Sequence, residues 1–191
     1  SLSSAALAPG QYAAFVELHI EQGPLLEREG LPIGIVEAIA GPSSYRLRLL
    51  GEGGHAGAVL MPDRHDAGLA GAEIALAVER AVLASGSPDT VGTTGVFRQF
   101  PNAVNSVPCD VTLEIDVRDT RLDTRRRAWS DVESAIVEVC SRRDVRWTLE
   151  TLNADRPATC APALVDVVTR TCADLGVPAR RLVSRAYHDA L

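Results

Sequence analysis

Two of the four histidines lie where an imidazole could bind a metal ion or act as a base. His19 closes the apolar run from Tyr12 to Ile20 and is followed by Glu21, and His188 lies in the sequence Tyr-His-Asp-Ala near the end of the chain. Neutral imidazole is a common metal ligand, and sites in α/β proteins lie at the carboxyl ends of strands. A histidine at the end of a buried strand can equally be a satisfied core residue, so the residues alone leave both interpretations open.

Three further residues could bind a small ligand. His55 lies in Gly-Gly-His-Ala-Gly, where the flanking glycines allow the backbone a close approach to a ligand, although a surface turn has the same composition. Asn105 and Arg118 flank the alternating run 111–117. Arginine is suited to bidentate carboxylate binding, so Arg118 indicates an acidic ligand unless it is an ordinary surface charge. No phosphate-binding loop, dinucleotide fingerprint or nucleophile elbow is found in the sequence.

The middle of the chain, 43–153, carries the clearest pattern of secondary structure. Its hydrophobic periodicity predicts the order strand, helix, strand, strand, helix, strand. This order is typical of a ferredoxin-like α+β sandwich, an antiparallel four-stranded sheet with two helices on one face. The predicted strands cover 45–49, 90–100, 111–117 and 145–152, and the predicted helices cover 67–83, capped by Asp63 or Asp66, and 124–142.

The outer segments, 1–42 and 154–191, are predicted to form one α/β domain that the sandwich interrupts. The predicted strands are 12–20, 33–40 and 182–183, the predicted helices are 25–29 and 162–175, and 184–190 is a predicted loop. The fold class is therefore α/β with an inserted α+β domain, divided as 1–42, 43–153 and 154–191.

Charge and composition exclude several classes of partner. The 19 basic residues are all arginine, the 25 acidic residues leave a net charge of −6, and nucleic-acid binding is not expected because it depends on neutralising phosphates. The run 125–127 is expected to be a solvated helix face. No apolar run approaches the roughly 20 residues of a membrane span. The widely spaced Cys109, Cys140, Cys160 and Cys172 indicate free thiols and a cytoplasmic location.

Taken together, the motifs resemble one enzyme family. Glu-Leu-His-Ile-Glu-Gln-Gly-Pro comes first, followed by Gly-His-Ala-Gly with Met-Pro-Asp-Arg-His-Asp-Ala, then Asn-x-x-Pro before Asp-Val-Arg, and finally His-Asp-Ala. In order and spacing they resemble the amidohydrolases that cleave N-carbamoyl-L-amino acids, allantoate and ureidopropionate. That family is a branch of the dinuclear zinc aminoacylase and carboxypeptidase superfamily. The resemblance runs from about Tyr12 to the last residue.

The resemblance implies a metal-dependent hydrolase of linear amide or ureido C–N bonds. His19 would bind one of two divalent ions and His188 the other, and zinc, manganese or cobalt would suit such ligands. The ions would activate a water for attack on the carbonyl carbon.

The resemblance also implies how substrate binds. Gln22 would hydrogen-bond the amide or ureido group, while Asn105 and Arg118 would bind the carboxylate of a small-molecule substrate from across the dimer. His55 would reach across from the partner subunit and stabilise the oxyanion. The sandwich would be a lid and dimerisation domain, so a homodimer is expected.

Two features depart from the family pattern. In Ser-Arg-Ala-Tyr-His-Asp-Ala, Arg185 and Tyr187 replace glycines of the family, and Tyr187 is expected to narrow the substrate pocket. Family members are also about twice as long, and their remaining ligands and general base lie upstream of the His19 motif. The chain is therefore expected to be a fragment that alone binds metal weakly and does not turn over substrate.

Two alternatives remain open at the level of sequence. The chain could be a non-catalytic dimerisation module whose histidines have lost their function. It could also belong to the same superfamily but hydrolyse peptides or N-acyl amino acids.

Overall fold

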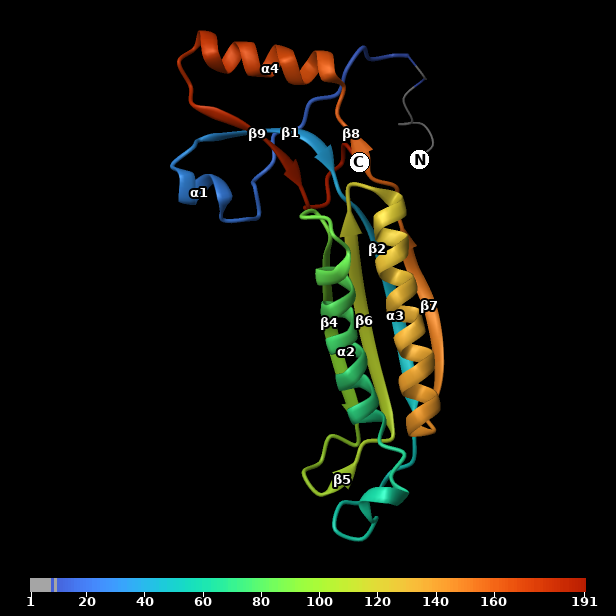
Figure 1. Cartoon of the computed structure of the whole chain (residues 1–191). Helices are drawn as coiled ribbons and strands as arrows, with labels where there is room; N and C mark the ends of the chain where they lie inside the picture. Colours follow the sequence, from blue (N-terminus) through green and yellow to red (C-terminus); the bar gives the residue numbers. More distant parts are fainter. Residues whose placement is uncertain (1–7, 9) are drawn as a thin grey trace.

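The computed structural model describes residue 8 and residues 10–191 of the chain, arranged around two principal sheets. Figure 1 shows the longer sheet extending away from the smaller one, with β3 and β5 at its far end. The helical segments are α1 (Leu25–Glu29), η2 (Met61–Asp63), α2 (Ala67–Ala84), α3 (Leu122–Arg143) and α4 (Pro162–Asp174). The strands are β1 (Ile33–Ile39), β2 (Gly41–Leu50), β3 (Gly54–His55), β4 (Val91–Phe100), β5 (Ser106–Val107), β6 (Asp110–Asp119), β7 (Arg146–Ala154), β8 (Ala158–Thr159) and β9 (Ala179–Ser184).

The longer sheet has the order β4-β6-β2-β7, and every neighbouring pair is antiparallel. Helices α2 and α3 cover one of its faces (Figure 1). The alternation along β6 produces this arrangement, because Val111, Leu113, Ile115 and Val117 point to the helices and are almost completely buried. The predicted ferredoxin-like sandwich is confirmed, with β2, β6 and β7 longer than the sequence pattern indicated and β4 one residue shorter.

Local signals fix the two helices on that sheet. The Asp66 carboxylate accepts a hydrogen bond of 2.9 Å from the Leu69 N–H, so Asp66 is the N-cap of α2. Helix α3 buries the predicted stripe that includes Val132 and Ile136. Trp129 stacks on Tyr45 of β2 with ring centroids 3.4 Å apart, which joins the helix to the sheet.

The smaller sheet has the order β8-β1-β9, in which β1 and β9 are parallel and β8 is antiparallel. Helix α4 packs on β1 and β9, and α1 ends at Gly30 in the left-handed conformation, with φ of 64°. The carboxyl ends of β1 and β9 lie together, because the Ala40 N–H donates to the Ser184 carbonyl at 2.8 Å. The loop that carries His188 begins at this edge.

The segment from Tyr12 to Ile20 is not a strand, so that prediction is wrong. None of the described residues forms a backbone–backbone hydrogen bond with this segment, and Leu18 and Ile20 are 95% and 74% exposed. An apolar run forms a strand only where another strand supplies hydrogen-bond partners. Residues 15–20 of the segment instead line the cavity described below.

Arg125 is buried, whereas the run 125–127 was expected to be a solvated helix face. Its guanidinium Nη1 donates to the carbonyls of Gly41 and Asp155, at 2.5 and 2.6 Å respectively. These carbonyls lie where the chain enters and leaves the sandwich, and a Cβ at Gly41 would overlap the backbone at Asp155. Burial lowers the pKa of the Arg125 guanidinium from its usual value, but arginine stays protonated at neutral pH. Within the run 125–127, only Arg126 and Arg127 are exposed to solvent.

Replacing Arg125 by alanine should lower the free energy of unfolding by about 2–4 kcal/mol, because a buried carbonyl (Gly41) and a partly buried one (Asp155) lose a charged donor. Chemical denaturation of the full-length protein measures the change. Arg126→Ala is the matched control, since Arg126 is exposed on the same helix and should change stability by less than about 0.5 kcal/mol. Equal effects of the two substitutions would contradict the role assigned to Arg125.

Among the described residues, no helix is both long and apolar enough to cross a membrane. All four cysteines are free, as the sequence predicted. The cytoplasmic location stays a prediction of the sequence.

Candidate metal and carboxylate site

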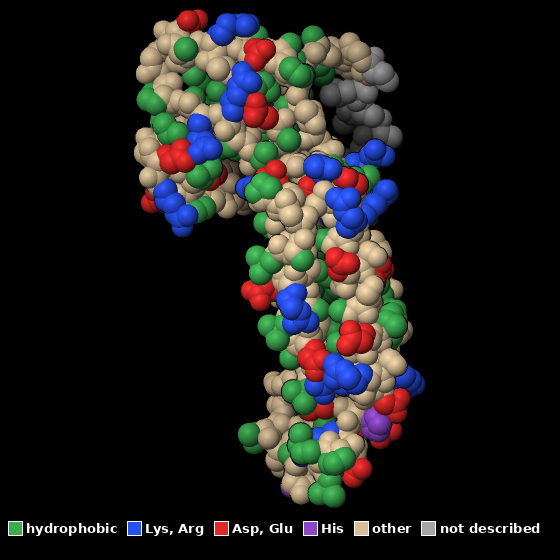
Figure 2. All heavy atoms as spheres, in the orientation of Figure 1, with side chains coloured by type: hydrophobic (Ala, Val, Ile, Leu, Met, Phe, Trp, Pro, Cys, Tyr) green, Lys and Arg blue, Asp and Glu red, His purple; other side chains and the backbone are tan. Residues whose placement is uncertain are grey.

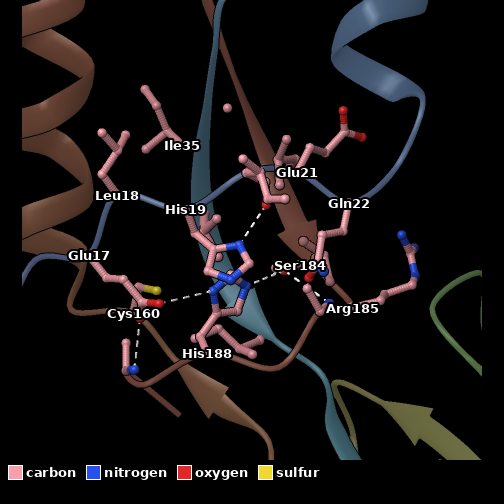
Figure 3. Close-up of a pocket in the computed structure, with 18 of the residues that line it drawn as sticks. Glu17, Leu18, His19, Glu21, Gln22, Ile35, Cys160, Ser184, Arg185 and His188 are labelled. Atoms are coloured by element: carbon pink, nitrogen blue, oxygen red, sulfur yellow. Dashed lines mark hydrogen bonds and ion pairs between the residues drawn. The ribbon is translucent and has the colours of Figure 1, made fainter.

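Three metal-ligating side chains meet beside the smaller sheet. The ligand atoms of Glu17, His19 and His188 all lie within 4.8 Å of one another. The two imidazole rings meet edge to face, with centroids 4.3 Å apart and planes at 71° (Figure 3). The structure thus brings together the two histidines singled out from the sequence, although 168 positions of chain separate them.

Hydrogen bonds orient both imidazoles. His19 Nδ1 lies 2.6 Å from the Ile20 carbonyl and must donate to it, which leaves the lone pair of Nε2 free for a metal ion. His188 Nε2 lies 2.6 Å from the hydroxyl of Ser184, and that hydroxyl also accepts from the Ala186 N–H at 3.2 Å. Partners of this kind fix the orientation of ligating histidines.

Glu17 was missed by the sequence reasoning. Its carboxylate accepts a hydrogen bond of 3.0 Å from the Ala190 N–H and lies 3.7 Å from His188 Nδ1. The Ala190 N–H, more than the nearby imidazoles, lowers the pKa of the Glu17 carboxyl below its usual value. The signal was present in the sequence, because Glu17 and His19 are two residues apart and an extended chain directs such side chains to the same side.

The donor set fits a divalent transition metal ion. Imidazole nitrogen and carboxylate oxygen bind zinc at about 2.0–2.2 Å, and the same ligands suit manganese and cobalt. Glu21 is not part of this set, because its two carboxylate oxygens accept hydrogen bonds from the N–H groups of Leu25 and Leu26 at the start of α1. Within the part of the chain that the structure describes, Glu17, His19 and His188 are the residues grouped so that they could hold an ion.

A cavity extends from the metal-ligating cluster across the smaller sheet. It measures about 1470 Å³, and both Gln22 and Arg118 line it together with the two histidines. Gln22 has a positive φ of 53°, and Figure 3 shows its side chain directed toward the imidazoles. The cavity exceeds the roughly 300–1,000 Å³ typical of small-molecule sites, since the smaller sheet is open on this side.

Arg118 lies at the end of β6 where the sandwich meets this cavity. Its Nε and Nη2 donate to the Asp116 carboxylate at 2.6 and 3.4 Å, and its Nη1 donates to the Arg185 carbonyl at 2.8 Å. The Ser44 hydroxyl also donates to Asp116, at 2.9 Å. These contacts use three of the five N–H donors of Arg118 and leave two for a ligand.

His55 and Asn105 lie together at the opposite end of the sandwich. Strand β3 pairs with β5, and the Ala56 N–H donates to the Asn105 carbonyl at 2.8 Å. The Gly57 N–H donates to His55 Nδ1 at 3.1 Å, so the neutral ring carries its proton on Nε2 and presents a hydrogen-bond donor. Arg64 holds the loop by donating to the carbonyls of Val59, at 3.0 Å, and Ala56.

The six predicted site residues therefore form two groups within one chain. His19, His188, Gln22 and Arg118 line one cavity, whereas His55 and Asn105 are separated from it by ten-residue strands, about 33 Å in length. Arg118 reaches the cavity of its own chain, although it was expected to act across a dimer. His55 and Asn105 do not line this cavity.

The model of the peptidase family M20/M25/M40 matches residues 3–191. The chain belongs to this family. Two of its relatives are ureidoglycolate hydrolases, 47% identical over 186 residues in Oryza sativa subsp. japonica and 47% identical over 191 residues in Arabidopsis thaliana. An allantoate amidohydrolase of Escherichia coli is 35% identical over 191 residues.

The M20 chain spans less than half of the length of these relatives. The matches cover 97–100% of the chain but 38%, 40% and 46% of the three relatives. The crystal structure of AtUAH in complex with glyoxylate agrees in fold, with a TM-score of 0.92 and 46% identity, over 100% of this chain and 45% of that one.

Proposed function

We propose that the chain forms part of a metal-dependent hydrolase of linear amide or ureido C–N bonds in small carboxylates. The single observation that carries this proposal is the meeting of Glu17, His19 and His188 within 4.8 Å, in the cavity that Arg118 also lines. Metal ligands and a carboxylate-binding cation in one cavity suit hydrolysis of a substrate that has an acid group near the scissile bond. The names of the M20 relatives support the same reaction class.

Ureidoglycolate is the first substrate to test. Two relatives at 47% identity are ureidoglycolate hydrolases, and AtUAH binds glyoxylate, a small carboxylate. Tyr187, which replaces a glycine of the family pattern, lines the cavity and is 54% exposed. A phenol at this position favours a smaller substrate than allantoate or an N-carbamoyl amino acid with a bulky side chain.

Arg118, Gln22 and His55 each have a separate task in the proposed mechanism. Arg118 binds the substrate carboxylate through its two unused N–H donors, and Gln22 hydrogen-bonds the amide or ureido group. Divalent ions, when bound, supply Lewis acidity and lower the pKa of water. The Nε2–H of His55 donates to the oxygen on which negative charge develops, an interaction that strengthens in the transition state.

Only three ligating side chains are found in this cluster among the residues that the structure describes. A pair of ions needs more ligands than this set provides. We therefore propose that the relatives' remaining length corresponds to the part of the protein that supplies further ligands and the general base, and that this chain alone does not turn over substrate.

We also propose a homodimer in which the sandwich brings His55 and Asn105 to the partner's cavity. Strand β4 is an edge strand with a single charged residue, Arg98, and such edges pair readily with another chain. Beside it, Leu69, Leu76 and Leu83 of α2 repeat every seven residues and are 44–79% exposed. An unpaired edge beside an apolar stripe fits a second copy of the sandwich.

The end of the sandwich that carries His55 is also apolar. Leu60, Met61 and Val104 are among its exposed side chains, and Figure 2 shows hydrophobic side chains gathered at this end. Exposed apolar patches beside polar functional groups mark binding surfaces. This end of the sandwich is suited to cover the cavity of a partner subunit.

Heterodimers made of two different variant subunits test which residues act between subunits. A purified heterodimer of full-length His55→Ala and His19→Ala subunits should regain about half of the wild-type activity, because one of its two sites combines an intact His19 with the partner's intact His55. A heterodimer of Arg118→Ala and His19→Ala subunits should keep the raised KM of Arg118→Ala, with no recovery of the wild-type KM, because Arg118 serves its own chain. Recovery in the second pair, or none in the first, would contradict this assignment.

The reaction itself is tested with the full-length metal-loaded protein. Ammonia release should be fastest with ureidoglycolate and slower with allantoate and N-carbamoyl-L-amino acids, and no free amino acid should be released from dipeptides. Removal of metal with a chelator should abolish it and added zinc, manganese or cobalt should restore it. Preferential cleavage of dipeptides or N-acyl amino acids would favour the peptidase alternative, and no cleavage of any of these substrates would favour the non-catalytic module.

A further inference from the structure

Arg185 connects the loop that carries His188 to the sandwich. Its guanidinium Nη2 forms an ion pair with the Asp89 carboxylate and donates to the Pro88 carbonyl at 3.3 Å. Both partners lie in the connection between α2 and β4. The Thr120 hydroxyl, just beyond β6, lies 3.4 Å from the second oxygen of Asp89, so this carboxylate is itself held in place.

The backbone of the same residue holds Arg118. The Arg185 carbonyl accepts the hydrogen bond from Arg118 Nη1, while Asp116 takes the opposite side of the guanidinium. Arg118 is thus held from two directions, by a side chain of its own strand and by the backbone of the His188 loop. Movement of the loop would remove the second contact and let the guanidinium rotate about its stem.

We propose that Arg185 is a positioning residue: its ion pair with Asp89 fixes the loop so that the Arg185 carbonyl keeps Arg118 directed at the substrate carboxylate. This inference rests on the proposed function, in which Arg118 binds that carboxylate. Arg185 itself acts through Arg118 and through the loop, and its own guanidinium is engaged with the sandwich.

The connection between the loop and the sandwich depends on the residue type at position 185. The amidohydrolase pattern that the chain resembles has glycine at this position, and glycine offers no side chain with which to hold the loop. The Arg185 and Asp89 side chains are 40% and 24% exposed, so their ion pair adds little to global stability. Its effect is geometric, because correct orientation of a binding group decides how well it serves the reaction.

The test uses full-length, metal-loaded protein with ureidoglycolate as substrate and three variants, Arg185→Gly, Asp89→Asn and Arg185→Lys. Arg185→Gly and Asp89→Asn should each raise KM about tenfold and leave kcat within about twofold, because the loss falls on carboxylate orientation. Arg185→Lys keeps a cation opposite Asp89 and should stay close to wild type. A lowered kcat at unchanged KM, or a wild-type KM in Arg185→Gly, would overturn the proposal.

Hydrogen exchange separates this inference from the proposed function. The N–H groups of Ala186 and Ala190 are both hydrogen-bonded, to Ser184 and Glu17. Their exchange in the folded protein, measured in a proteolytic peptide that covers 184–191, should accelerate several-fold in Arg185→Gly and Asp89→Asn. It should stay unchanged in Arg185→Lys. Unchanged exchange in all three variants would overturn the proposed connection, and this readout holds whether or not the protein cleaves ureidoglycolate.

Discussion

Replacing Arg118 by alanine in the full-length protein should raise KM for a carboxylate substrate about 10- to 100-fold, since charge-assisted hydrogen bonds contribute roughly 1.5–3 kcal/mol. The structure supports this size of effect because Arg118 lines the cavity and keeps two N–H donors free after its contacts with Asp116 and Arg185. Steady-state kinetics with ureidoglycolate measures the change.

The matched control is Arg48→Ala. Arg48 lies on the same open face of the sheet, six residues along β2 from Pro42, the residue that pairs with Arg118. It forms an ion pair with Asp110 at 2.6 Å but does not line the cavity. Its replacement should leave KM unchanged. An unchanged KM in Arg118→Ala, or an equal rise in both variants, would remove the role assigned to Arg118.

Replacing His19 by alanine should lower metal bound per subunit and weaken metal affinity by at least about tenfold, since loss of even an outer partner of a ligand costs about 10- to 100-fold. Its Nε2 is left free by the hydrogen bond from Nδ1 to Ile20, and it meets His188 and Glu17 at one point. Elemental analysis of the dialysed protein, followed by titration with zinc, gives both quantities.

His65→Ala removes an imidazole far from this cluster. His65 precedes α2 and lies 3.4 Å from the Asp144 carboxylate at the other end of the sandwich, so its loss should leave the metal content unchanged. Full metal occupancy in His19→Ala would show that His19 is a structural residue.

Local patterning was sufficient to predict the sandwich. Strand β6 alternates along its whole length, α3 carries a continuous apolar stripe, and Asp66 caps α2 as its position indicated. Each of these signals acts within a few residues, and the sheet that they form is paired entirely within this chain. The segment from Tyr12 to Ile20 has an equally apolar sequence, but no strand of the described residues pairs with it, so local composition gave a wrong prediction there.

The sequence by itself determined which side chains could do chemistry, because His19, His188 and Arg118 stand in motifs that resemble those of an amidohydrolase family in order and spacing. Only the tertiary structure decided which of them lie together. It added Glu17 to the two imidazoles, assigned Arg118 to the cavity of its own chain, and separated His55 from that cavity by the length of the sandwich. It also buried Arg125 between the two chain crossings. The physical reason is that residue type fixes what a side chain can bind, whereas distances between residues far apart in sequence are set by the packing of whole elements.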